Sequence, residues 1–257
     1  MPESKPTLVF VHGAFHGPEC FKPLVQLLKD AGYPCVGDFG LPGTGNSSTA
    51  GLEEDAEALR SVVLKVLGGG NNCLVVVHSY GGLPAIQGLG GLGKKDRGDQ
   101  PAVLKIVYLS ACIPKKGESQ KQQEFTFLEA NNIERRDLHD LLNIKDGVGT
   151  FIGEDDFFYN DLPEETKKEL YSKLKTQSMK TLFTPLTYTA YEEIPGWYLV
   201  ATKDLALSPK FQKYMLRNAG DMMEVVEEID AGHSSFISQP EKVADFIMRA
   251  ATCGGDA

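Results

Sequence analysis

An apolar run that leads into a serine flanked by glycines is the feature of this chain that most limits its possible folds. The run 73–77, Cys-Leu-Val-Val-Val, is typical of a buried strand, and the segment 83–87 is typical of a helix. His78-Ser79-Tyr80-Gly81-Gly82 lies between them. A serine at such a sharp turn projects its hydroxyl above the sheet, and the N–H of the next residue points to where an oxyanion would form. The segment therefore predicts a nucleophile, Ser79, and half of an oxyanion hole, Tyr80, in an α/β sheet.

The turn departs from the usual pattern G-x-S-x-G, because Val77 stands at the first glycine position. A second interpretation is therefore a serine that caps an ordinary strand-to-helix turn, since its hydroxyl accepts hydrogen bonds from the first helical N–H groups. Gly81 and Gly82 keep the helix side of the turn open and favour the nucleophile.

Composition narrows the class of protein. The 257 residues are 42% hydrophobic and 24% charged, which fits one large α/β domain. The net charge of −9 excludes nucleic acid as an expected partner, since an acidic surface repels phosphates. We expect no membrane insertion, because no long apolar segment occurs, and the scattered five cysteines favour reduced thiols and a cytoplasmic protein. The sequence leaves a homodimer open.

Strand and helix signals alternate along most of the chain. The expected strands are 7–11, 32–36, 73–77, 103–109, 197–201 and 223–229, and the expected helices are 18–31, 52–66, 83–87, 208–219 and 239–251. This order predicts an α/β fold with a mostly parallel sheet of about six strands, covered by helices on both faces.

Residues 113–191 interrupt this alternation with charged helical segments and aromatic clusters. The stretch is too long for a plain connection, so it predicts a helical cap inserted before the penultimate strand of a core formed by 1–112 and 192–257. A surface insertion without a role is the alternative interpretation.

A nucleophilic serine needs a histidine base, and the histidine needs a carboxylate that orients it. His233 follows the last expected strand, at the sheet edge where Ser79 also lies. Asp204 follows the strand 197–201, and its competitor Asp230 stands too close to His233 and more naturally shapes that turn. The predicted catalytic residues are Ser79, Asp204 and His233, in the chain order of α/β hydrolases.

The loop after the first strand, 12–17, should supply the second oxyanion donor, because its glycines let the backbone approach a substrate. We assign the N–H of Ala14, with Phe15 as the alternative. The glycines of 88–93 formally match G-x-G-x-x-G, but they follow a helix, so we expect no nicotinamide cofactor. Metal-ligand spacing is also missing, and we expect neither a metal nor an organic cofactor.

With these motifs the chain resembles the α/β-hydrolase superfamily, and specifically its small branch of plant methylesterases and hydroxynitrile lyases. The resemblance rests on 12–17, 78–82, 158–160, Asp204 and the pair Gly232-His233, and it spans nearly the whole chain. Lyases of this branch carry a threonine in the first loop and a lysine after the catalytic histidine. This chain has Gly13 and Ser234 at those positions, so the resemblance favours ester hydrolysis.

The expected function is a serine esterase that acts on small apolar or aromatic esters through an acyl-enzyme. The candidate substrate-binding residues are aromatic or imidazole side chains of the first loop and the cap, namely Phe15, His16, Phe157, Phe158 and Tyr159. Two alternatives stay open: a lyase or cyclase of secondary metabolism on the same fold, and a small-ligand receptor derived from a hydrolase.

Overall fold

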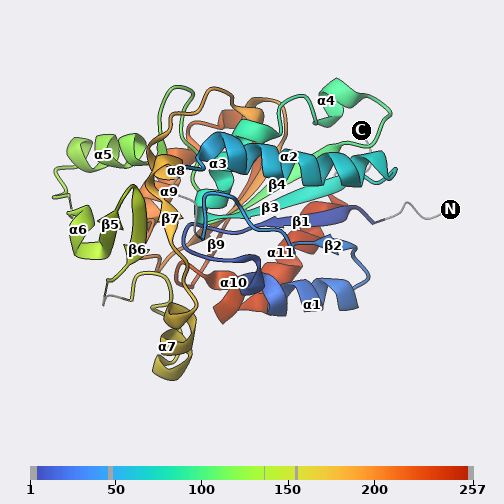
Figure 1. Ribbon diagram of the computed structural model, residues 1–257. Helices are drawn as coiled ribbons and strands as arrows, with labels where there is room; N and C mark the ends of the chain where they lie inside the picture. Colours follow the sequence, from blue (N-terminus) through green and yellow to red (C-terminus); the bar gives the residue numbers. More distant parts are fainter. Residues whose placement is uncertain (1–4, 46–48, 136, 154–155, 254–257) are drawn as a thin grey trace.

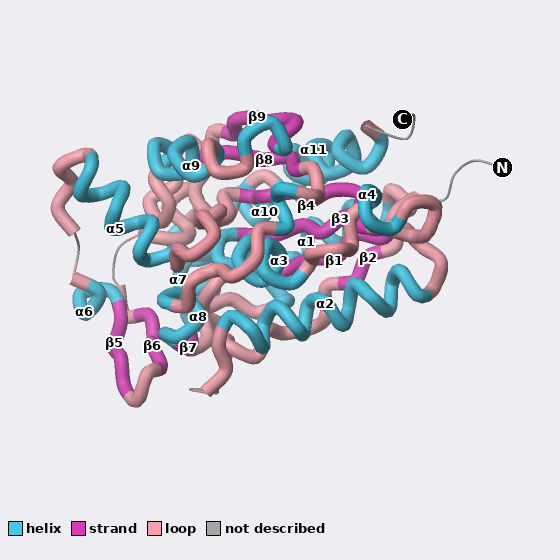
Figure 2. Tube along the Cα trace, turned by 90° about the horizontal axis from the view of Figure 1, so that it is seen from above, coloured by secondary structure: helices cyan, strands magenta, loops and turns pink. Residues whose placement is uncertain are grey.

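The computed structural model describes residues 5–45, 49–135, 137–153 and 156–253. A six-stranded sheet forms its centre, and every neighbouring pair of strands is parallel (Figure 1). The strands are β1 (Thr7–Val11), β2 (Cys35–Val36), β3 (Cys73–His78), β4 (Val103–Leu109), β8 (Gly196–Ala201) and β9 (Met223–Ile229). Their order β2-β1-β3-β4-β8-β9 can be followed from one side to the other in Figure 2. The predicted α/β-hydrolase fold class is confirmed.

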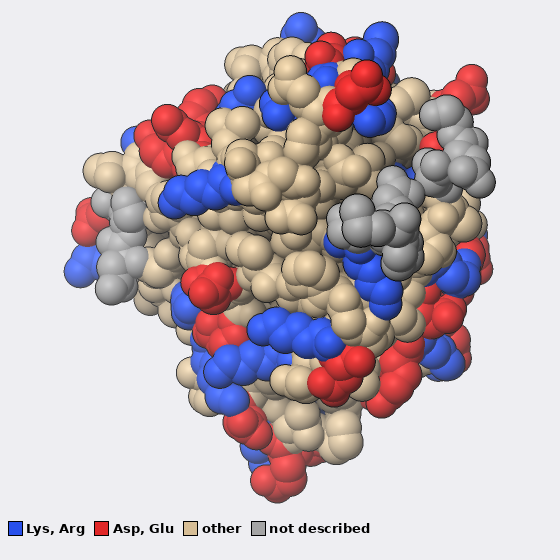
Figure 3. Space-filling model, turned by 90° about the vertical axis from the view of Figure 1, so that its right-hand side faces the viewer, with Lys and Arg blue, Asp and Glu red and all other residues tan. Residues whose placement is uncertain are grey.

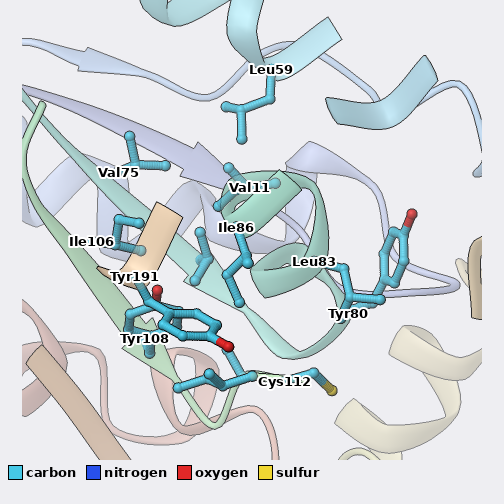
Figure 4. Packing of buried hydrophobic residues seen from close by; sticks show 14 of the residues in the cluster. Val11, Leu59, Val75, Tyr80, Leu83, Ile86, Ile106, Tyr108, Cys112 and Tyr191 are labelled. Carbon is cyan, nitrogen blue, oxygen red and sulfur yellow. The ribbon is translucent and has the colours of Figure 1, made fainter. Parts of the chain in front are cut away.

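Helices cover both faces of the sheet because its central strands are apolar on both sides (Figure 1). One face is covered by α2 (Leu52–Gly68), α3 (Gly82–Gly88) and α9 (Pro209–Leu216), and the other by α1 (Lys22–Asp30), α10 (Ser235–Ser238) and α11 (Pro240–Thr252). Strand side chains alternate between the two cores. Val9, Val11, Val75 and Val77 belong to the α2 side, where Figure 4 shows Val11 and Val75 near Leu59, and Leu8, Phe10, Leu74 and Val76 belong to the other.

Several short elements lie between these strands and helices. They are α4 (Lys94–Arg97) and the 3-10 turns η1 (Pro18–Phe21), η2 (Ser79–Gly81), η3 (Ala190–Glu192) and η4 (Gly220–Met222). The glycines of 88–93 lie at the end of α3 and in the turn before α4, where Gly91 takes a φ of 70°.

The segment between β4 and β8 projects at the end of the sheet away from the chain termini (Figures 1 and 2). It holds α5 (Gln120–Ala130), α6 (Leu138–Leu141), α7 (Glu164–Ser172) and α8 (Met179–Phe183). It also holds β5 (Leu142–Lys145), β6 (Val148–Phe151) and β7 (Gln177–Ser178), an antiparallel sheet that the helical expectation missed. The limits 113–191 for the cap stay a prediction.

The surface at the terminal end of the molecule carries basic and acidic side chains interspersed around uncharged ones (Figure 3). Within the described residues, no helix combines the length and the apolar character that a membrane crossing requires. The cytoplasmic location and the homodimer stay predictions.

Candidate active site

Ser79 occupies a strained turn between β3 and α3. Its φ is 52°, a left-handed conformation that costs free energy for a residue with a side chain. The turn is possible because glycines stand two and three positions after Ser79, at Gly81 and Gly82. A Cβ on Gly81 would lie 2.6 Å from the carbonyl oxygen of Val11, and one on Gly82 would lie 2.3 Å from that of Cys112. The backbone around Ser79 is therefore packed against β1 and the end of β4.

The missing first glycine of the motif has a structural explanation. Val77 is fully buried and its side chain joins the core cluster on the α2 side of the sheet. The close approach occurs instead at Gly13 in the facing loop, where a Cβ would lie 3.0 Å from Cβ of Ser79 and 2.9 Å from Nδ1 of His78. The glycine that the turn needs is supplied by the neighbouring loop.

His233 and Asp204 meet at the carboxyl end of the sheet. Nδ1 of His233 lies 2.7 Å from Oδ2 of Asp204, and both side chains are buried. Asp204 also accepts N–H hydrogen bonds from Ala206 and Leu207, both 2.8 Å long, and one from the Gln212 amide at 3.0 Å. Because a carboxylate only accepts, the neutral ring of His233 carries its proton on Nδ1 and presents a lone pair at Nε2. Nε2 is buried and has no hydrogen-bond partner in the described chain, so it is available to Ser79.

The rival carboxylate, Asp230, lies outside this cluster. It is exposed and forms an ion pair with Lys203 at 2.9 Å. The ring of His78 lies against the ring of His233, with centroids 4.6 Å apart, and its Nε2 lies 3.1 Å from the backbone oxygen of His233. Burial, followed by the nearby His233 and His16, holds the pKa of His78 well below its usual value of 6.5, so this histidine is neutral and donates from Nε2.

The hydrogen bonds of the loop after β1 favour Ala14 over Phe15 as the candidate oxyanion donor. Phe15 has a φ of 64°, its N–H donates to Oε1 of Gln177 at 3.1 Å, and its oxygen accepts from the N–H of Lys175 at 2.7 Å. Both backbone groups of Phe15 are therefore occupied by the segment around β7. This geometry favours Ala14, which lines the same cavity as Ser79.

Sequence reasoning missed two buried residues below this loop. Asp55 of α2 accepts a hydrogen bond from the Tyr80 hydroxyl at 2.6 Å and one from the N–H of Gly43 at 2.6 Å. Gln177 accepts from the Thr44 hydroxyl at 2.9 Å as well as from Phe15. An acidic residue beside the apolar stripe of the helix 52–66 was a usable signal for Asp55, whereas nothing in the sequence marked Gln177.

A cavity of about 380 Å³ opens over Ser79. Its walls come from the first loop, the inserted segment and the loop after β8, and they are rich in phenylalanine: Phe15, Phe125, Phe127, Phe151, Phe157, Phe158 and Phe211. The structure thus brings Phe15, Phe157 and Phe158 to the same cavity as Ser79, and their role in substrate binding stays a prediction.

His16 and Tyr159 lie outside this lining, against a second cavity of about 400 Å³. Nδ1 of His16 donates to the backbone oxygen of Ala14 at 2.7 Å, and Nε2 accepts the Tyr159 hydroxyl at 2.8 Å. Burial lowers the pKa of His16 to about 4, so the ring is neutral. The hydrogen-bonded pair of His16 and Tyr159 therefore supports the backbone of the loop that carries Ala14.

No group of three or more histidine, cysteine, aspartate or glutamate residues is arranged to hold a metal ion in the described part of the chain.

Comparisons with known proteins agree with this fold. The model of the family described as "Alpha/beta hydrolase family" matches residues 8–246. The chain is 31% identical to "Probable hydrolase R7" of Phoma sp., over 96% of this chain and 99% of that protein. It is 24% identical to "Methylesterase 9" of Arabidopsis thaliana, over 95% of this chain and 97% of that protein. A crystal structure of a mutant of polyneuridine aldehyde esterase superimposes with a TM-score of 0.74 at 16% identity, covering 95% of this chain and 98% of that chain.

Proposed function

This chain belongs to the alpha/beta hydrolase family, resembles its methylesterase-like branch, and is a carboxylic ester hydrolase; we propose that it cleaves esters of small apolar or aromatic molecules through Ser79, His233 and Asp204. The observation that carries this proposal is the meeting of Asp204 and His233 at 2.7 Å, with Nε2 of His233 left without a partner at the sheet edge where Ser79 stands.

In the first half of the proposed reaction, Nε2 of His233 takes the proton of the Ser79 hydroxyl as Oγ attacks the ester carbonyl. The negative charge moves to the carbonyl oxygen, which the N–H groups of Ala14 and Tyr80 stabilise. Asp204 fixes the tautomer of His233 and stabilises the imidazolium that forms. The alcohol then leaves with the proton from Nε2, and an acyl-enzyme remains on Ser79.

The second half repeats these steps with water. His233 takes a proton from the water as it attacks the acyl-enzyme, the same N–H groups hold the second oxyanion, and the proton returns to Oγ of Ser79 as the acid departs. Each donor of such an oxyanion hole is worth about 3 kcal/mol of transition-state stabilisation.

The substrate class follows from the walls of the cavity. Its volume of about 380 Å³ suits a small organic molecule, and its phenylalanines offer apolar and aromatic surface. Lyases of this branch carry a threonine where this chain has Gly13. A Cβ at that position would lie 2.9 Å from Nδ1 of His78, so position 13 gives the lyase alternative no support.

The experiment that tests this function compares the hydrolysis of a short-chain p-nitrophenyl ester by the wild type and by Ser79→Ala at equal concentration. We expect turnover in the wild type and its loss in the variant, together with covalent labelling of the wild type alone by a serine-directed fluorophosphonate probe. Equal hydrolysis by both proteins would contradict the role of Ser79. Labelling of Ser79 without hydrolysis of any ester would instead favour a lyase, a cyclase or a receptor.

A further inference from the structure

One polar side chain on the wall of the cavity over Ser79 has no role in the reaction just described. Gln120, the first residue of α5, lines the cavity over Ser79 and is only 8% exposed. Its Oε1 is buried without a hydrogen-bond partner in the described chain. Burying an amide group without a partner costs about 1–3 kcal/mol, so such a group calls for an explanation.

The other polar side chains of this wall are either satisfied or exposed. Lys121 and Glu124 form an ion pair with each other at 2.6 Å. The Ser208 hydroxyl accepts the N–H of Phe211 at 3.3 Å, and Ser208 is exposed. Among the described residues that line the cavity, Ser79 and Gln120 are the two buried polar side chains, and phenylalanine and leucine supply most of the remaining surface.

The backbone of Gln120 is held firmly, as a recognition residue requires. The preceding residue, Ser119, caps α5 by accepting the N–H of Gln122 at 3.1 Å. One turn further on, the amide of Gln123 donates to the backbone oxygen of Ile113 at 3.1 Å. The start of the helix is thereby tied to the segment that leaves β4.

We propose that Gln120 is a specificity residue, which binds an uncharged hydroxyl group of the substrate while the ester carbonyl lies at Ser79. This inference rests on the proposed esterase function and narrows its substrate class to apolar or aromatic esters that carry a hydroxyl group away from the reacting carbonyl. A hydroxyl both donates and accepts, as the amide does, so the two groups pair without a net charge. A charged substituent is disfavoured because it would have to compete with the Lys121–Glu124 ion pair, whose two charges already neutralise each other on this wall.

The test uses matched esters that differ by one hydroxyl. One set consists of the methyl esters of phenylpropanoic acid and of its ring-hydroxylated derivatives, and the other of the acetates of phenylpropanol and of its ring-hydroxylated derivatives. Together the two sets place the hydroxyl on the acyl side or on the alcohol side of the ester. The values of kcat/KM are measured for the wild type, for Gln120→Met and for the control Gln122→Met, which makes the same change at an exposed position of the same helix.

We expect the kcat/KM of the wild type to be about 10-fold or more higher for at least one hydroxylated ester than for the matching ester without the hydroxyl. Without the hydroxyl, the Gln120 amide is left unpaired. Gln120→Met should bring that ratio close to one and keep turnover of the ester without the hydroxyl, whereas Gln122→Met should behave as the wild type. Binding of the same pair to the Ser79→Ala protein, measured by calorimetry, should show the preference without any turnover.

Two outcomes would overturn the inference. One is Ser79-dependent hydrolysis with no preference for any hydroxylated derivative, which leaves the esterase function standing. The other is a preference that survives in Gln120→Met. If Gln120→Met does not fold, the calorimetric comparison on the Ser79→Ala protein decides alone, since equal affinities for both members of every pair contradict a hydroxyl site. Absence of any ester hydrolysis would contradict the proposed function itself.

Discussion

The hydroxyl of Tyr80 donates a 2.6 Å hydrogen bond to Oδ2 of Asp55, so a buried carboxylate of α2 anchors a residue whose N–H is one of the two candidate oxyanion donors. The other oxygen of Asp55 accepts the N–H of Gly43 at 2.6 Å. Asp55 is completely buried, and burial raises its pKa to about 6. One side chain thus ties the turn after β3 to the loop around Gly43.

Asp55→Asn should weaken both activity and stability. An asparagine has one acceptor oxygen where the aspartate has two, so one of the two donors would face an NH₂ group and lose its partner. We expect a loss of about 1–3 kcal/mol in the free energy of unfolding, and a decrease in kcat of roughly 10-fold through a displaced Tyr80 N–H. Chemical denaturation and initial rates measure the two effects. The exposed neighbour Glu57→Gln is the control and should change neither; an Asp55→Asn protein of full activity would contradict the anchoring role.

Asp204→Asn should remove most of the activity with little change in fold. The amide would present a donor to Nδ1 of His233 and favour the wrong tautomer, a change that lowers kcat by about 10⁴-fold in enzymes with this arrangement. Asp230→Asn is a matched control, because that carboxylate lies exposed beside Lys203. Steady-state kinetics of the two variants should separate them clearly, and a comparable loss in Asp230→Asn would mean that the acid has been misassigned.

Gln177→Leu should lower kcat with little effect on KM. The change leaves the N–H of Phe15 without its acceptor and frees the left-handed residue next to Ala14. An oxyanion hole depends on donors fixed in advance, so we expect a decrease in kcat of about 10-fold. Thr44→Val removes the other hydrogen bond to Oε1 of Gln177 and keeps the one from Phe15, so its kcat should stay near that of the wild type. A KM effect alone in Gln177→Leu would point to substrate binding instead.

The elements of the core could be predicted closely because their signals are local. The apolar runs predicted β1 and β4 with the observed bounds, since a parallel sheet buried on both faces requires continuous apolar strands. The bounds of β9 were also predicted, although this edge strand alternates half-buried and exposed residues along most of its length. Asp204 and His233 were predicted because each follows such a strand, and all parallel strands of one sheet end at the same edge.

The support of the site could not be predicted in the same way, because it depends on contacts between distant segments. Gln177 lies in a two-residue strand, and nothing near it in sequence indicates that it meets Phe15. The β5-β6 hairpin, in contrast, had a local signal that was overlooked. Asp146 and Gly147 form its two-residue turn with φ values of 51° and 78°, the combination that an Asp-Gly pair favours.

Gly82→Ala should destabilise the protein strongly. The added Cβ would lie 2.3 Å from the backbone oxygen of Cys112, and backbone cannot move aside as a flexible side chain can. We expect a loss of more than about 2 kcal/mol in the free energy of unfolding, as found for overpacked cores. Gly68→Ala at the end of α2 is the opposite case: nothing lies within 4 Å of the new Cβ, so the protein should gain roughly 0.4–1 kcal/mol. Thermal unfolding of both variants checks the pair, and equal effects would show that the close packing at the Ser79 turn is not needed.

The buried neutral His16 should make the protein sensitive to acid. Burial lowers the pKa of His16 in the folded protein to about 4, from a usual value of 6.5, so the unfolded chain takes up the proton at a higher pH than the folded protein does. The stabilisation is therefore complete above pH 6.5 and is lost as the pH falls towards 4, with a slope of at most about 1.4 kcal/mol per pH unit from this residue. His16→Gln carries no titrating group, and its side-chain oxygen can still accept the Tyr159 hydroxyl. Denaturation at several pH values should show the difference in unfolding free energy between wild type and variant shrinking between pH 6.5 and 4 and staying constant above; a difference independent of pH would mean that His16 is protonated equally easily in the folded protein.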